Sequence, residues 1–150
     1  MSIINAGVEA PHFEGIDQNG QHVDLKSLKG SKVVLYFYPK DSTPGCTAEA
    51  CDLRDNYQLL ISKGYKVVGV SPDNESSHKK FADKYELPFP LLPDPDKKII
   101  EAYGVWGPKK FLGKSYEGVL RTTFIISEDG IIEEVIGKVD TKNHTQQIIK

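Results

Sequence analysis

The chain has 150 residues, of which 39% are hydrophobic and 27% charged, and this is typical of a single globular domain, here residues 1–150. Its 19 basic and 21 acidic residues give a formal net charge of -2, so charge provides no general attraction to nucleic acid or to an anionic membrane. No apolar run is long enough to cross a bilayer, and the N-terminus lacks the basic start and apolar stretch of a secretory signal. We therefore expect a cytoplasmic protein with no nucleic-acid or membrane partner.

The first half of the chain predicts a hairpin followed by a strand, a helix and a second strand. Residues 13–17 and 21–25 flank an Asn-Gly pair, which is the strongest local signal for a hairpin turn. Residues 33–38 are all apolar or aromatic, as in a central strand that is covered on both faces. Residues 44–63 carry apolar side chains at helical spacing and predict one helix, and residues 65–71 predict a second buried strand.

The second half of the chain predicts further alternation of helices and strands. The expected elements are a helix opened by residues 72–75, an edge strand at 89–92, a helix at 96–103, a hairpin of strands 122–126 and 131–136, and a last helix at 141–150. The Gly- and Lys-rich stretch 105–118 is interpreted as a loop. Its Trp106, Phe111 and Tyr116 either pack locally, which we favour, or line a substrate or partner surface. The order of elements predicts an α/β fold of the thioredoxin-like type, with a central mixed β-sheet flanked by helices on both faces and an N-terminal β-hairpin.

Two cysteines follow the predicted central strand, within residues 39–51. Thr43 is a candidate N-cap and Pro44 a candidate first helical residue, which makes Cys46 the third residue of the helix. The unpaired N–H groups and the dipole at a helix N-terminus stabilise a thiolate. Two cysteines are too few for a secreted disulfide scaffold, so this close pair indicates a catalytic or redox-active site.

The helix N-terminus alone does not account for a reactive thiolate. An ordinary thiol is roughly 3% ionised at pH 7, and making it mostly thiolate requires about 3.4 kcal/mol. A helix N-terminus supplies about 0.3–1 kcal/mol, or about 2 kcal/mol in a favourable buried geometry. A nearby cation is therefore required, and the candidates are Lys40, Arg54 and Arg121. We favour Arg121, because a planar guanidinium suits an oxygen-rich transition state and the chain has only two arginines.

The segment Tyr36-Phe37-Tyr38-Pro39-Lys40-Asp41-Ser42-Thr43-Pro44-Gly45-Cys46-Thr47 resembles the active-site segment of the peroxiredoxins, whose pattern is Pro, three residues, Thr, two residues, Cys. It is most similar to their bacterioferritin comigratory protein (PrxQ) branch. The similarity continues through residues 69–73, 103–106, 118–124 and 129–130, and so covers nearly the whole chain. The resemblance implies a thiol peroxidase of antioxidant defence that needs no cofactor. It would reduce hydrogen peroxide and organic hydroperoxides and be recycled by thioredoxin or a similar dithiol reductant.

The resemblance also assigns roles to individual residues. Cys46 would attack the peroxide and become a sulfenic acid, with the Cys46 amide, the Thr43 hydroxyl and the Arg121 guanidinium as donors to the transition state. Arg121 matches the position of the family's active-site arginine. Pro39 would shape the pocket, and Glu49 would orient Arg121 or an adjacent backbone group.

By the same resemblance, Cys51 would attack the sulfenic acid and form an intramolecular disulfide with Cys46. On a regular helix, positions i and i+5 lie about 140° apart with their Cα atoms about 8–9 Å apart. A disulfide requires less than about 7 Å, so we expect the helix from Thr43 to about Arg54 to unwind on oxidation. A packing role for Cys51, with an external thiol as the resolving partner, stays open. Since both cysteines lie in one predicted helix, a monomer is the simplest expectation.

Two other function classes stay open at this point. A thioredoxin-like disulfide oxidoreductase has the same fold but two residues between its cysteines, whereas here there are four. A noncatalytic binding protein can use any fold, although the intact set of Thr43, Cys46 and Arg121 argues against it. The histidines show no metal-ligand spacing with the cysteines, so no metal site is expected and we interpret them as solvated or structural. These histidines are His12, His22, His78 and His144.

Overall fold

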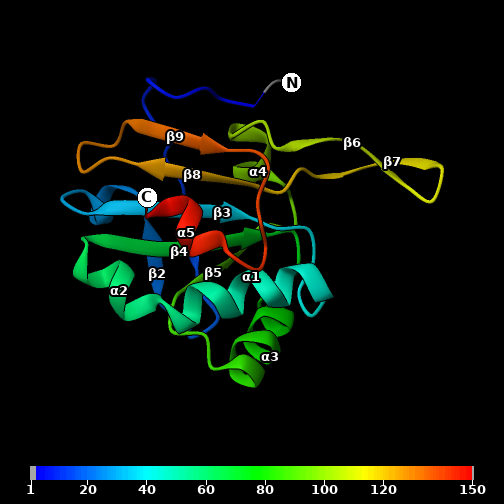
Figure 1. Ribbon diagram of the computed structural model, residues 1–150, viewed down its shortest axis with the longest axis horizontal. Helices are drawn as coiled ribbons and strands as arrows, with labels where there is room; N and C mark the ends of the chain where they lie inside the picture. Colours follow the sequence, from blue (N-terminus) through cyan, green and yellow to red (C-terminus); the bar gives the residue numbers. More distant parts are fainter. Residues whose placement is uncertain (1–2, 150) are drawn as a thin grey trace.

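The centre of the computed structural model is a five-stranded sheet with the strand order β5-β4-β3-β8-β9 (Figure 1). The structure describes residues 3–149, apart from the side chain of Phe111. The strands are β3 (Lys32–Phe37), β4 (Tyr65–Ser71), β5 (Leu91–Pro93), β8 (Thr122–Ile126) and β9 (Ile132–Ile136). The central strand β3 pairs in parallel with β4 and antiparallel with β8, so the predicted mixed sheet is confirmed.

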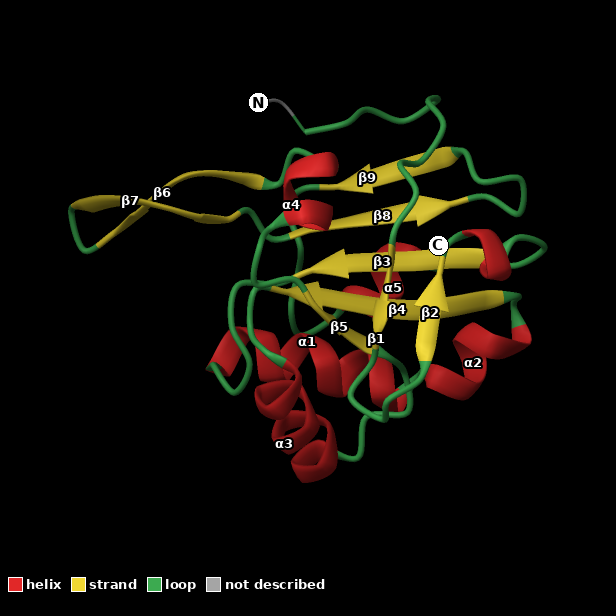
Figure 2. Ribbon diagram, turned by 180° about the vertical axis from the view of Figure 1, so that it is seen from behind, coloured by secondary structure: helices red, strands yellow, loops and turns green. Residues whose placement is uncertain are grey.

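Helices cover both faces of this sheet, as predicted (Figures 1 and 2). One face carries α1 (Pro44–Asp55), α2 (Tyr57–Ser62), α3 (Glu75–Tyr85) and α5 (His144–Ile148). The other carries α4 (Lys98–Ala102), a short 3-10 helix (Lys26–Leu28) and the N-terminal hairpin of β1 (Glu14–Ile16) and β2 (His22–Asp24). Along β3 the side chains alternate between two buried cores, because successive residues of a strand point to opposite faces. Val34 and Tyr36 pack under α1, whereas Leu35 and Phe37 pack against the α4 face.

The single helix predicted for residues 44–63 is in fact two helices. The chain leaves helical geometry at Asn56, which has φ -108° and ψ 14°. The Asn56 side chain donates a hydrogen bond to the Asp52 carbonyl oxygen at 2.8 Å, in addition to the bond at 3.2 Å from its own amide to the same oxygen. Gly64, with φ of 87°, follows α2 and ends the helical run as expected. None of the helices within residues 3–149 has the length and hydropathy that a membrane crossing requires.

The loop predicted for residues 105–118 is also wrong, since this stretch forms a long hairpin that projects from the body of the protein (Figures 1 and 2). Its strands are β6 (Trp106–Phe111) and β7 (Lys114–Val119), joined by a tight turn in which Leu112 and Gly113 both have positive φ. Glycine, proline and lysine interrupt the alternation of apolar and polar residues in this stretch, so periodicity did not reveal the strands.

Several predicted elements have different bounds in the structure, among them the edge strand and the last helix. The edge strand expected at 89–92 is β5, which begins after Pro90 and pairs only with β4. The last helix, expected at 141–150, is the five-residue α5, and Lys150 lies outside the described residues. Although short, α5 packs directly on α1 and brings residues from the end of the chain beside the first turns of that helix (Figure 1).

Candidate active site

Cys46 lies in the first turn of α1, a few residues after the end of β3. It is the third helical residue, as predicted, with Pro44 first and Thr43 at the N-cap position. The thiol is free and only 1% exposed. Thr43 makes no side-chain capping bond to the helix; its hydroxyl donates to the Lys40 carbonyl oxygen at 2.9 Å. The first amides of α1, including that of Cys46, belong to the set that has no partner within a helix.

Arg121, in the short connection between β7 and β8, holds its guanidinium against Cys46. Nη2 donates to the Cys46 Sγ atom at 3.3 Å, and Nη1 donates to Glu49 Oε1 at 2.7 Å. Burial lowers the pKa of Arg121, but the neighbouring Cys46 and Glu49 outweigh burial, so the pKa is raised overall. A Cβ atom on Gly45 would lie 3.3 Å from Nη2, so glycine at this position leaves room for the guanidinium. The arrangement therefore keeps a cation fixed beside the sulfur.

Glu49 lies one turn beyond Cys46 on α1 and is fully buried. Burial raises the pKa of its carboxyl group to about 7, although the charge and hydrogen bond of Arg121 act in the opposite direction. Its second oxygen, Oε2, has no hydrogen-bond partner among the described residues and lies 3.5 Å from Nε2 of His144. His144 comes from α5 and is also fully buried, and no signal in the sequence placed it next to Glu49.

A pocket of about 620 Å³ opens above this cluster. Pro39, Thr43 and Arg121 line it, so the structure brings these three predicted site residues together. Trp106 and Tyr116 form part of the opposite wall, on the β6 and β7 hairpin. Trp106 packs against the core of the α4 face and against Lys97, as the favoured interpretation has it, and it also lines the pocket, as the exposed Tyr116 does. The remaining lining residues are Lys40, Pro44, Gly45, Pro72, Lys109, Gly118 and Val119.

Cys51 lies five residues beyond Cys46 on the same helix, and neither cysteine is among the residues that line this pocket. Its thiol is free and partly exposed. Because α1 is continuous through both cysteines, their Cα atoms are about 8–9 Å apart by helical geometry, which is too far for a disulfide. Of the other two candidate cations, Lys40 lines the pocket, whereas Arg54 bonds to Asp55 and to the Tyr85 carbonyl oxygen.

A buried network that the sequence did not reveal fixes the loop between β3 and α1. At its centre is the Asp41 carboxylate, which accepts hydrogen bonds from the Tyr38 hydroxyl at 2.6 Å and the Ser77 hydroxyl at 2.8 Å. Nδ1 of the buried His78 lies 2.6 Å from the same carboxylate. The Asp41 amide in turn donates to Asp73 Oδ2 at 2.6 Å. The loop that precedes Cys46 is thus tied to β3 and α3.

The Asp41→Asn variant is expected to lose about 2–3 kcal/mol of unfolding free energy at pH 7, because an amide cannot accept all these bonds as a carboxylate does. Burial raises the pKa of Asp41, but the bonds from His78, Tyr38 and Ser77 lower it more, so it lies below its ordinary value. A lowered pKa contributes stability that is present above the unfolded pKa, about 3.9, and is lost as the pH falls through the folded one. The difference between the two proteins should thus shrink as the pH falls below about 4.

Urea unfolding at these pH values measures this difference. Asp83→Asn serves as the control, because Asp83 is exposed on α3 and pairs only with Lys79 in the described structure. Its cost should stay within about 0.5 kcal/mol at every pH. Equal costs for the two variants would show that the Asp41 network does not hold the loop.

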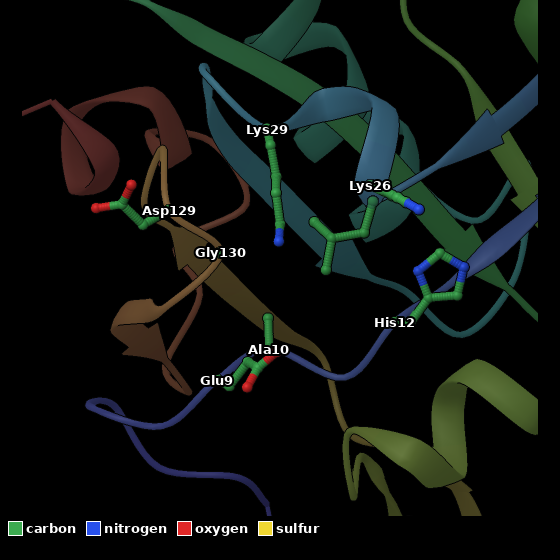
Figure 3. Close-up of a pocket in the computed structure, with 8 residues that line it drawn as sticks. Glu9, Ala10, His12, Lys26, Lys29, Asp129 and Gly130 are labelled. Atoms are coloured by element: carbon green, nitrogen blue, oxygen red, sulfur yellow. The ribbon is translucent and has the colours of Figure 1, made fainter.

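A second pocket of about 180 Å³ lies between the N-terminal segment, the 3-10 helix and the turn joining β8 to β9 (Figure 3). Figure 3 shows Lys26 and Lys29 on one side of it and Glu9 and Asp129 on the other. None of the predicted site residues lines this pocket, whereas Pro39, Thr43 and Arg121 line the larger one. The candidate site is therefore the larger pocket beside Arg121.

Comparison with known proteins gives the same family from sequence and from structure. The model of the AhpC/TSA family matches residues 6–135. Peroxiredoxin Bcp of Escherichia coli (strain K12) is 44% identical over 149 residues, which are 99% of this chain and 96% of that protein. Peroxiredoxin Bcp of Bacillus subtilis (strain 168) is 44% identical over 147 residues, 98% of this chain and 94% of that protein. A solved structure of the bacterioferritin comigratory protein of Xanthomonas campestris, described for its alkyl peroxide reduction activity, has a TM-score of 0.87 and 33% identity, covering 96% of this chain and 94% of that one.

Proposed function

The chain belongs to the AhpC/TSA family, in the peroxiredoxin Bcp (PrxQ) branch, and we propose that in this thiol peroxidase Cys46 is the residue that attacks the peroxide. The observation that supports Cys46 most directly is the 3.3 Å contact from Arg121 Nη2 to its sulfur in the first turn of α1. A fixed cation and unpaired helix amides both favour the thiolate, which is the nucleophilic form of a cysteine.

In the proposed first step, the Cys46 thiolate attacks the terminal oxygen of the peroxide. A sulfur–oxygen bond forms, the oxygen–oxygen bond breaks, and the leaving oxygen takes up a proton to give water or an alcohol. Negative charge spreads over the sulfur and both oxygens in the transition state. The Cys46 amide, the Thr43 hydroxyl and Arg121 are the proposed donors to this charge, and loss of one such donor typically costs about 3 kcal/mol. To donate there, the Thr43 hydroxyl would turn away from the Lys40 carbonyl oxygen that it contacts in the structure.

The pocket supports organic hydroperoxides as substrates in addition to hydrogen peroxide. Pro39, Trp106 and Tyr116 give it apolar walls beside Arg121, and these can pack against an organic group while the guanidinium contacts the oxygens. The similar protein from X. campestris, whose described activity is alkyl peroxide reduction, agrees with this proposal. Glu49, bonded to Nη1 of Arg121, is the proposed residue that orients the guanidinium.

Cys51 is the proposed resolving residue. It would attack the Cys46 sulfenic acid, form a disulfide and release water. Since α1 holds the two cysteines too far apart for this bond, the helix must first unwind. Unwinding would also break the bonds that the Thr145 amide and hydroxyl donate to Asp52 Oδ2, at 2.7 and 2.8 Å, which join α1 to α5.

Oxidation is expected to remove amide-exchange protection from α1, while β3 and β4 keep theirs. The central strands provide the control, because they are paired on both sides and need no rearrangement. Hydrogen exchange of the reduced and peroxide-treated protein, compared residue by residue, measures the difference. The Cys51→Ser variant should retain protection in α1 after oxidation. Identical protection of α1 in both redox states of the unmodified protein would refute the proposed resolving step.

We further propose thioredoxin or a similar dithiol as the reductant of this disulfide, in the cytoplasm. Both cysteines lie on α1 of one chain, so the cycle needs no second subunit, and a monomer of one domain suffices. Peptide mapping of the oxidised protein, combined with peroxide turnover coupled to thioredoxin, tests the cycle as a whole. A disulfide between Cys46 and Cys51 within one chain supports it. Turnover of disulfide substrates without any peroxide consumption would contradict it.

A further inference from the structure

Glu49 and His144 form a buried acid and base pair directly beneath Arg121 and Cys46. Both side chains have an exposed fraction of 0%, and Glu49 Oε2 lies 3.5 Å from His144 Nε2. One oxygen of Glu49 already accepts the Arg121 bond, while Oε2 has no hydrogen-bond partner among the described residues. Burying an ionised carboxylate oxygen without a hydrogen-bond donor costs free energy. Protonation of this oxygen would avoid that cost.

The surroundings of His144 show which ring nitrogen carries its hydrogen. Gln147 is oriented by two backbone contacts: its Oε1 accepts from the Asp140 amide at 2.9 Å, and its Nε2 donates to the Lys138 carbonyl oxygen at 2.9 Å. The His144 Nδ1 atom lies 2.8 Å from that same Oε1, so Nδ1 is the donor. In the neutral ring, Nε2 is then an acceptor with one lone pair. The Thr123 hydroxyl lies 2.8 Å from it, and Glu49 Oε2 faces it from 3.5 Å.

We propose that Glu49 carries a proton on Oε2, the oxygen on the side of His144, and that this proton keeps the charge of Arg121 available to the Cys46 sulfur. The inference rests on the proposed role of Cys46. With the proton in place the Glu49 and His144 pair is uncharged, and the thiolate is the main negative charge facing the guanidinium. Without it, the Glu49 carboxylate competes for Arg121 and repels the thiolate. His144 is thus a positioning residue that acts through Glu49.

The charged and titratable groups around the pair agree with this assignment. Burial raises the pKa of Glu49 to about 7 against the opposing effect of Arg121, and Asp52 raises it further. Burial lowers the pKa of His144, although Gln147, Asp52 and Asp140 oppose this. The raised pKa of Glu49 and the lowered pKa of His144 both favour an uncharged carboxylic acid beside an uncharged imidazole ring. The remaining groups are Tyr36, whose pKa is raised mainly by burial and then by Glu49, and Lys109, whose pKa is lowered mainly by burial and then by Arg121.

The proposal predicts that the rate constant for peroxide reduction falls roughly tenfold as the pH rises above 7, because loss of the Glu49 proton adds a negative charge beside Arg121. Glu49→Gln is the decisive variant. Its amide oxygen can accept from Arg121, and its amide nitrogen carries hydrogen on the side of His144, as the protonated acid does. The ratio of rate constants at pH 6 and pH 8.5 should therefore drop to less than about twofold in this variant. A pH dependence caused by titration of Lys109 would instead persist in the Glu49→Gln variant.

Two spectroscopic readouts test the proton without relying on activity. The infrared spectrum of the wild-type protein should show a protonated carboxylic acid at pH 6 that disappears above pH 7 and is absent from Glu49→Gln. Nitrogen NMR of labelled histidine should show His144 as the neutral Nδ1–H form throughout this range.

Glu101→Gln, an exposed position on α4, is the matched control and should behave as the wild type in every measurement. Absence of the acid band, a charged or Nε2–H ring of His144, or an unchanged pH dependence in Glu49→Gln would each overturn the inference. Peroxide reduction that survives in Cys46→Ser would instead contradict the proposed function, and it would leave the infrared and NMR results unaffected.

Discussion

The Cys46→Ser variant is expected to lose peroxide reduction completely, whereas Cys51→Ser should reduce one equivalent of peroxide per chain and then stop. A serine hydroxyl is not ionised near neutral pH and does not replace the thiolate as a nucleophile. Among the described residues, Arg121 bonds to Cys46 and Glu49 and not to Cys51, so loss of Cys51 leaves the first step intact and removes only the partner for the disulfide. Stopped-flow measurement of peroxide consumption, followed by mass analysis of the sulfenic acid, separates these two outcomes.

The two serine variants act as controls for each other, because both change a sulfur to an oxygen on the same helix. In Cys51→Ser, an external thiol should restore turnover by resolving the Cys46 sulfenic acid. Equal loss of the first turnover in both variants would contradict the division of roles between the two cysteines.

The second large effect is expected for Arg121→Gln, which should lower the second-order rate constant with peroxide by about 100- to 1,000-fold. Glutamine removes the charge that Arg121 places 3.3 Å from the Cys46 sulfur, and it cannot contact Glu49 and the sulfur together as the guanidinium fork does. Arg121→Lys keeps the charge without the fork and should give an intermediate rate. Single-turnover kinetics measured at several pH values would show whether the loss concerns the thiolate or the attack itself.

Arg54→Gln provides a matched control, since the chain has only two arginines and Arg54 bonds to Asp55 and to Tyr85 rather than to the site. Its rate constant should stay within about twofold of the wild type. A comparable decrease in the Arg54 and Arg121 variants would show that the positive charge acts from a distance, and not through contact with the sulfur.

The elements that the sequence predicted correctly are those set by local chemistry. The Asn19-Gly20 pair predicted the hairpin of β1 and β2, and the apolar run before Pro39 predicted the central strand β3. The start of α1 followed from Thr43 and Pro44, which favour a helix N-terminus irrespective of the rest of the fold. The same local signals placed Cys46 in the first turn of α1, so the candidate nucleophile could be identified from the sequence.

What the sequence did not predict depends on contacts between distant segments. The pairing of Glu49 with His144 joins α1 to the end of the chain, and the Asp41 network joins a loop to α3. No periodicity or motif reports such contacts. The hairpin of β6 and β7 was not predicted because its strands lack an alternating apolar pattern. The end of α1 at Asn56 did carry a signal, since asparagine favours helix ends over helix interiors.

The most direct test of the account is the ionisation of the Cys46 sulfur at pH 7, measured by thiolate absorbance in the Cys51→Ser variant, where it is the only sulfhydryl. The same sample unfolded in urea gives the reference for an ordinary thiol, roughly 3% ionised. We predict that the folded protein is mostly thiolate and that unfolding removes the signal. An equally small thiolate fraction in the folded and unfolded protein would contradict the claim that α1 and Arg121 activate this cysteine.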